Sequence, residues 1–177
     1  MSKIYILCIE DEPEVLEAVV RDLAPFEVAF PIESASTAAE ARRVVESILQ
    51  QGRLGLVLCD HILPGEDGVS FLVSLHRDPR TTSARKVLLT AQAGLADTIQ
   101  AVNQADLNHY IAKPWKPAEL HAVVRQQLTE FVLQHESNLY PYLSLLDGER
   151  LGEKIRQQPL PRTNSCARQR SFPPPPW

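Results

Sequence analysis

The sequence predicts an α/β fold, a doubly wound parallel sheet of five strands with helices on both faces. Two observations lead to this prediction. Short apolar runs alternate along the chain with longer amphipathic segments, and the apolar runs are continuous. Continuous runs are typical of parallel strands, because these strands are buried on both faces. Strands that alternate with helical segments favour a parallel sheet.

Five segments are expected to form the strands: residues 4–9, 27–32, 54–59, 87–89 and 109–112. The second reads as a weaker strand, because Pro31 interrupts it and proline cannot donate a hydrogen bond to a neighbouring strand.

Amphipathic segments follow each strand and predict five helices. The first has Pro13 at an early position and is stopped by Pro25. The second is capped by Ser36 or Thr37, runs to about Gln51 and is followed by Gly52. The third covers residues 69–76. The apolar residues that mark the last two are Leu95, Ile99 and Val102, and then Leu120, Val123, Val124, Leu128 and Phe131.

Composition limits the class of protein. A chain of 177 residues has room for one ordinary domain and a short extension. The net charge of −4 argues against direct nucleic-acid binding. No stretch approaches the roughly 18 apolar residues of a membrane span, and the short apolar run at the start lacks the length and cleavage site of a signal peptide. We therefore expect a cytoplasmic protein without membrane contact.

The three cysteines do not form a disulfide framework or a zinc motif. Cys8 and Cys59 lie in strand-like runs, where we interpret them as small core residues, with a redox pair as the alternative. Cys166 lies in the tail.

Polar residues follow the predicted strands at the point where each one ends. Glu10 and Asp11 follow the first strand, Asp60 the third, Thr90 the fourth and Lys113 the fifth. The carboxyl ends of parallel strands meet at one edge of the sheet, where open α/β folds place their active regions. We therefore expect these five side chains to lie close together.

Three carboxylates on one edge repel one another, and such a cluster is most stable around a bound cation. Oxygen ligands favour a hard ion such as Mg²⁺. Bound Mg²⁺ would shield Asp60, so that a phosphoryl group could approach its carboxylate. An ammonium and a hydroxyl suit the phosphoryl oxygens. The set predicts a site that forms and holds an aspartyl phosphate.

Residues 1–133 resemble the receiver domain of two-component response regulators. The resemblance rests on four motifs in order: the acidic pair Glu10-Asp11, the segment DHILPGEDG that begins at Asp60, the pair Thr90-Ala91, and Tyr110 before Lys113-Pro114. We accordingly expect a flavodoxin-like strand order, 2-1-3-4-5. In two places the sequence departs from the family: Glu10 replaces a commoner Asp, and Glu66 stands where receivers often carry an apolar residue.

The resemblance implies a role for each site residue. Asp60 would accept the phosphoryl group, and Asp11, Asp60 and the backbone carbonyl of Ile62 would ligate Mg²⁺, with Glu10 acting through water. Lys113 and Thr90 would contact the phosphoryl group. Thr90 and Tyr110 would form the switch. The Lys113-Pro114 bond is often cis in this family.

The same resemblance implies the partners. A histidine kinase or phosphotransfer protein would supply the phosphoryl group, and a downstream protein would bind the face of the fourth and fifth helices and the fifth strand. A homodimer is compatible with this reading. The protein would be a signalling switch rather than an enzyme, with slow self-dephosphorylation only.

Other interpretations remain open. Asp60 alone reads equally well as a turn residue, Tyr110 as a half-buried strand aromatic, and His61 as an acid–base group. One alternative function is a degenerate receiver that binds proteins without phosphorylation. Another is an aspartate-nucleophile phosphohydrolase, although Ile62 occupies the position of the general acid in such enzymes.

The chain divides into three predicted parts: a receiver domain over residues 1–133, a helical extension or linker over 134–158, and a Pro-rich tail over 159–177. The tail holds positive charges and ends in PPPPW, and we expect it to be disordered or extended.

Overall fold

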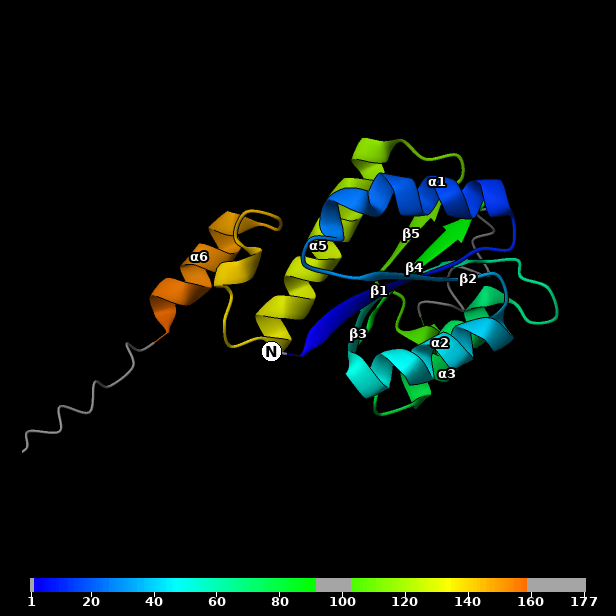
Figure 1. Cartoon of the computed structure of the whole chain (residues 1–177), viewed down its shortest axis with the longest axis horizontal. Coiled ribbons are helices and arrows are strands. Elements are labelled where there is room, and N and C mark those ends of the chain that lie inside the picture. The colour runs from blue at the N-terminus through cyan, green and yellow to red at the C-terminus, as the bar shows by residue number, and fades with distance from the viewer. Residues whose placement is uncertain (1, 92–102, 159–177) are drawn as a thin grey trace, which may run out of the picture.

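The computed structural model describes residues 2–91 and 103–158. Its core is a five-stranded sheet in the order β2-β1-β3-β4-β5 in which every strand pair is parallel (Figure 1). This order confirms the predicted doubly wound fold. The strands are β1 (Lys3–Ile9), β2 (Ile32–Ala35), β3 (Gly52–Asp60), β4 (Arg85–Thr90) and β5 (His109–Ala112).

Helices cover both faces of the sheet. They are α1 (Pro13–Leu23), α2 (Ala38–Gln51), α3 (Gly68–Arg77), α5 (Pro117–His135) and α6 (Gly148–Gln157), with short 3-10 turns η1 (Ala24–Phe26) and η2 (Tyr140–Tyr142). As predicted, α1 begins at Pro13, and the Thr37 side chain caps α2 by accepting from the Glu40 N–H. The fourth predicted helix, marked by Leu95, Ile99 and Val102, lies outside the described residues.

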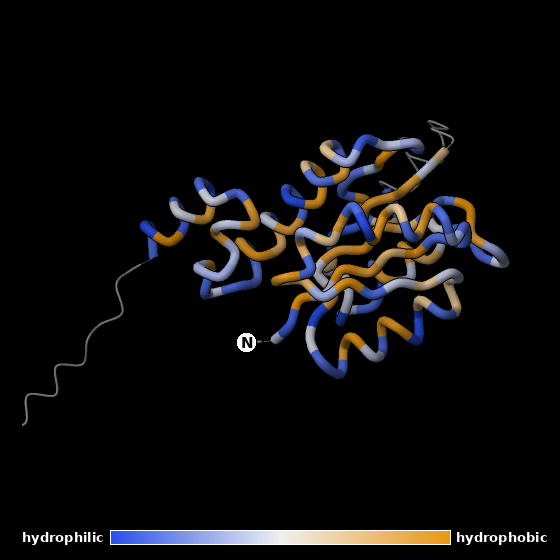
Figure 2. The backbone as a smooth tube through the Cα atoms, turned by 45° about the horizontal axis from the view of Figure 1, so that its top comes forward, coloured by the Kyte–Doolittle hydropathy of each residue, from blue (hydrophilic) through white to orange (hydrophobic). Residues whose placement is uncertain are grey.

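Two apolar layers enclose the sheet. Along β1, Ile4, Ile6 and Cys8 join the cluster of α1 and α5 residues, whereas Leu7 and Ile9 join that of α2 and α3. This alternation makes the strand apolar at every position from Ile4 to Ile9, and the apolar colour of the central strands is visible in Figure 2. Cys8 and Cys59 fall in different layers, so they pack on opposite faces of the sheet, which opposes the redox-pair alternative.

The predicted second strand, 27–32, is wrong. Residues 27–30 form a turn that continues from η1, in which the N–H groups of Ala29 and Phe30 both donate to the Phe26 carbonyl. Pairing with β1 begins only at Ile32, opposite Ile6. The apolar residues misled the prediction because Phe30 is fully buried in the turn, while the true edge strand has polar residues at its two central positions.

Residues 136–158 pack against the domain. Leu139, Tyr142, Leu146 and Leu151 are buried in the same cluster as α1 and α5. The Tyr142 ring stacks on Phe30 with 5.4 Å between centroids. The turn that contains Phe30 and the residues around Tyr142 therefore lie side by side, near the amino-terminal end of β1 (Figure 1). This part of the chain, predicted as a helical extension or linker, has a short 3-10 turn, η2, before Gly148 and the helix α6 starting at it.

Two further contacts fix α6 to α5. The buried Thr129 hydroxyl accepts a hydrogen bond from the Asp147 N–H at 3.2 Å, and Arg150 pairs with Glu130 at 2.7 Å. Among the helices of residues 2–91 and 103–158, none is long and apolar enough to cross a membrane.

Candidate functional site

Four strands end together and bring most of the predicted site residues to one edge, which we call the rim. Glu10 follows β1, Asp60 ends β3, Thr90 ends β4 and Lys113 follows β5. The strand registers align these ends, because Asp60 lies opposite Leu89, and Thr90 opposite Ala112. Residues that are 103 positions apart in the sequence, Glu10 and Lys113, are in direct contact as a result.

Three carboxylates form the centre of the rim. One oxygen each from Glu10, Asp11 and Asp60 lie within 4.8 Å of one another. Glu10 and Asp60 are buried, and Asp11 is less so. A set of carboxylate oxygens at this spacing fits a hard divalent cation, which would keep waters in its remaining positions. The donor chemistry therefore fits Mg²⁺ with Asp11 and Asp60 as ligands and Glu10 nearby.

The Lys113 ammonium lies between two of these carboxylates. Its Nζ is 2.5 Å from Glu10 Oε2 and 2.9 Å from Asp60 Oδ1. Burial lowers the pKa of Lys113, but the hydrogen bonds to Asp60 and Glu10 outweigh it and leave this pKa raised. Burial raises the pKa of Glu10, and the hydrogen bond from Lys113 offsets only part of that rise. The ammonium thus balances part of the negative charge of the rim.

The loop after Asp60 is held against the sheet at both ends. The His61 N–H donates to the Leu89 carbonyl at 2.9 Å, and the Gly68 N–H donates to the His61 carbonyl at 2.7 Å. Gly68 lies so close to the Asp60 carbonyl that a Cβ there would be 1.9 Å from its oxygen. Asp67 caps α3 by accepting from the Ser70 N–H. Asp60 is therefore followed by a tight, anchored loop.

Ile62, the predicted carbonyl ligand, lies in this loop two residues after Asp60, and the residue is 63% exposed. An apolar side chain cannot act as a general acid, which counts against the phosphohydrolase alternative.

The two predicted switch residues differ in their surroundings. Thr90 is buried, and its carbonyl accepts from the Lys113 N–H at 2.9 Å. Tyr110 is 47% exposed, and its ring lies beside the His109 ring. The Lys113-Pro114 peptide bond is cis, as the resemblance implies.

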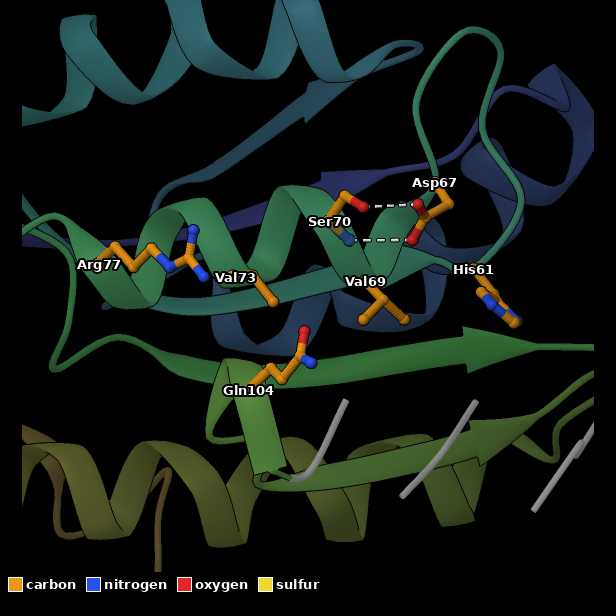
Figure 3. A pocket seen from close by; sticks show the side chains of 7 residues that line it. All are labelled: His61, Asp67, Val69, Ser70, Val73, Arg77 and Gln104. Atoms are coloured by element: carbon orange, nitrogen blue, oxygen red, sulfur yellow. Dashed lines mark hydrogen bonds between the residues drawn. The ribbon is translucent and has the colours of Figure 1, made fainter. Parts of the chain in front are cut away.

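A polar pocket of about 430 Å³ lies beside the rim, between α3 and the segment before β5 (Figure 3). Its lining residues are His61, Asp67, Val69, Ser70, Val73, Arg77 and Gln104. None of the three clustered carboxylates and neither Thr90 nor Lys113 belongs to this lining. The lining of the pocket therefore shares no residue with the carboxylate cluster, and it includes His61, the alternative acid–base group.

One contact near the site was not predicted from the sequence. Arg42 of α2 forms an ion pair with Glu66 of the loop after Asp60, at 2.6 Å. The two residues are 24 positions apart, with no spacing rule connecting them. The only signal in the sequence was the unusual charge of Glu66 at a position that is often apolar in receivers.

Comparison with known proteins agrees with this geometry. The family model of the response regulator receiver domain matches residues 6–125. Response regulator Rre1 of Synechocystis sp. is 36% identical over 125 residues, which are 71% of this chain and 52% of that protein. The transcriptional regulatory protein BasR of Escherichia coli is 33% identical over 134 residues, 76% of this chain and 56% of that protein. The chain thus spans about half the length of these relatives.

Solved structures give the same result. The signal receiver domain of an HD domain-containing protein from Pseudomonas fluorescens aligns with a TM-score of 0.67 and 25% identity, covering 78% of this chain and 96% of that one. The receiver domain of the sensor histidine kinase PA1611 from Pseudomonas aeruginosa, solved with a magnesium ion in its active-site cleft, aligns with a TM-score of 0.57 and 26% identity over 72% of this chain and 99% of that one. The chain belongs to the response regulator receiver family of two-component signal transduction.

Proposed function

We propose that Asp60 accepts a phosphoryl group in the presence of Mg²⁺, and that the resulting aspartyl phosphate changes the binding of a partner protein. The observation that supports this most directly is the position of the Asp60 carboxylate, within 4.8 Å of two other carboxylates and 2.9 Å from the Lys113 ammonium. The carboxylates can hold a cation, and the Lys113 ammonium can pair with a phosphoryl oxygen.

The chain's own residues have separate parts in the transfer. An Asp60 oxygen attacks phosphorus, and the bond from phosphorus to the donor's histidine nitrogen breaks as the new bond forms. Asp11, Asp60 and the Ile62 carbonyl would hold Mg²⁺, with Glu10 acting through water. The ion supplies charge neutralisation at the phosphoryl oxygens. Lys113 exchanges its contact with Asp60 for one with a phosphoryl oxygen, and the buried Thr90 hydroxyl pairs with another.

The output of the switch depends on Thr90 and Tyr110. Thr90 would move toward the new phosphoryl charge, and the exposed Tyr110 ring would then turn inward behind it. This changes the surface around β5, which a downstream protein or a second copy of the chain would recognise. The donor would be a histidine kinase or a phosphotransfer protein.

Acetyl phosphate labelling tests the proposal. The wild-type protein is incubated with acetyl phosphate, with and without Mg²⁺, and its intact mass is measured. We expect one phosphoryl adduct that requires Mg²⁺ and is absent in Asp60→Asn. Asp67→Asn is the matched control, because it changes a nearby carboxylate whose role is to cap α3, and asparagine also caps helices.

An equal adduct in Asp60→Asn would reject Asp60 as the acceptor. A folded wild-type protein that binds Mg²⁺ but forms no adduct would favour a binding module that works without phosphorylation.

A further inference from the structure

The contact between α2 and the loop after Asp60 is bidentate. Arg42 Nη1 donates to Glu66 Oε2 at 2.6 Å, and Nη2 donates to Oε1 at 2.7 Å. The Arg42 guanidinium also lies over the Phe71 ring, with 5.3 Å from Cζ to the centroid. Phe71 is fully buried in α3. Arg42 therefore connects α2, the loop and α3 through a planar group with a defined orientation.

The position of Glu66 in the loop gives this contact its importance. The loop is fixed at its ends by the backbone bonds of His61 and Gly68, while its tip contains Gly65 in a left-handed conformation with φ of 80°. Glu66 follows that turn and ties the tip to α2. The same loop carries Ile62 and continues directly from Asp60, so its position affects both groups.

We propose that Arg42 and Glu66 are positioning residues that latch the loop and thereby hold the Asp60 and Ile62 oxygens in place for the cation. This inference rests on the proposed function. In this protein an ion pair, rather than a packed apolar side chain, holds the loop in place. The cation affinity then depends on two charged residues that do not touch the ion.

The exposure of the pair separates this role from a general stabilising one. The Arg42 and Glu66 side chains are 45% and 31% exposed. Ion pairs with this much solvent contact change the free energy of unfolding little. Loss of the pair should therefore leave the thermal unfolding midpoint nearly unchanged, while the loop becomes less ordered and the cation is bound more weakly.

A Mg²⁺ titration by calorimetry of the wild type, Arg42→Gln, Glu66→Gln and the double variant tests the latch. If the two charges act only through their electric field, Arg42→Gln should strengthen Mg²⁺ binding, Glu66→Gln should weaken it, and the double variant should resemble the wild type. The latch predicts that both single variants weaken binding by about three- to fivefold, and that the double variant is no weaker than either.

The control pair is Arg80 and Glu46, which form a similar bidentate contact between α2 and the residues after α3. Arg80→Gln and Glu46→Gln should leave Mg²⁺ affinity within twofold of the wild type. Amide hydrogen exchange at residues 61–68 gives an independent measure, and we expect it to be faster in both latch variants than in either control.

The outcomes separate the latch from the proposed function. Opposite effects of the two single variants, or affinities equal to the wild type, would overturn the latch and leave the proposed function intact. A folded wild type that binds no Mg²⁺ would overturn both.

Discussion

The two ends of the sheet use different physical means to hold distant segments together. At the rim, Glu10, Asp60 and Lys113 are buried or nearly so, and they are held by charge and hydrogen bonds. At the opposite end, where the strands begin, the residues after α5 pack by apolar contact. Tyr142 stacks on Phe30, and Leu151 is fully buried.

This difference indicates a division of roles. Like charges that crowd the rim cost free energy unless a cation or an ammonium balances them. Apolar burial at the other end contributes about 25 cal/mol per Å² of surface removed from water. We infer that residues 136–158 fold as part of the receiver rather than as a linker, and that they stabilise the end of the sheet opposite the rim.

The largest effect is expected at Gly68, where the rim meets its loop. Gly68→Ala would place a methyl group 1.9 Å from the Asp60 carbonyl oxygen. Because the neighbour is backbone, the loop must shift, and we expect loss of Mg²⁺ binding and of phosphoryl labelling. At Gly65, φ is 80° but no atom lies within 4 Å of an added Cβ. Gly65→Ala should therefore cost about 1 kcal/mol of stability. An equal loss of Mg²⁺ binding and of phosphoryl labelling in Gly68→Ala and Gly65→Ala would contradict this prediction.

Leu151→Ala tests the apolar end. It leaves a cavity between α6 and the domain, and we expect the free energy of unfolding in urea to fall by about 2–5 kcal/mol. Lys154→Ala, on the exposed side of the same helix, should change it by less than about 0.5 kcal/mol. At a temperature where Leu151→Ala is folded, its Mg²⁺-dependent labelling should match the wild type. An unchanged unfolding curve would show that α6 is not part of the folding unit.

Lys113→Met separates cation binding from phosphoryl binding at the rim. Removal of the ammonium leaves three carboxylates unbalanced, so Mg²⁺ should bind about tenfold more tightly, which corresponds to about 1.4 kcal/mol. Labelling by acetyl phosphate should nevertheless slow, since the phosphoryl oxygens lose a charged partner. The exposed Lys116 provides the control, and Lys116→Met should change neither quantity. Weaker Mg²⁺ binding in Lys113→Met would mean that the ammonium organises the carboxylates instead of competing with the cation.

Lys86 should give the smallest effect, a change in the pH dependence of stability. Its Nζ is buried near the start of β4 and donates to the carbonyls of Thr82 and Ala84. Burial lowers its pKa from 10.5 to about 8. Between these values the unfolded chain binds more protons than the folded protein, so this lysine makes stability rise with pH. Urea unfolding from pH 7 to 10.5 should show a shallower rise in Lys86→Met than in the wild type. Identical pH profiles of stability in the wild type and Lys86→Met would exclude the lowered pKa of Lys86.

The rim could be predicted from the sequence because its residues are fixed by topology. Once Asp60 ends a strand and Lys113 follows another, a parallel sheet brings them to one edge whatever their separation in the chain. Neither the Arg42–Glu66 pair nor the Tyr142–Phe30 stack could be found this way. Each depends on how two segments meet through their side chains, and no periodicity encodes that.

The error in β2 has the same origin. Residues 28–30 are apolar, but only Phe30 is fully buried, where it packs against the residues after α5, whereas Val28 is exposed. The edge strand that follows, β2, is short and has polar residues at its two central positions, so it gives only a weak apolar signal. The apolar pattern therefore pointed to the burial of Phe30 but not to the turn that buries it, and it wrongly included the exposed Val28.

The most direct test of the account is to locate the phosphoryl group after labelling. The wild-type protein, labelled with acetyl phosphate and Mg²⁺, is digested, and the peptides are identified by mass spectrometry. We predict that the added phosphoryl mass is found on the peptide that contains Asp60, and on no peptide that carries Glu10 or Asp11. A phosphoryl group found on any other residue would contradict the account.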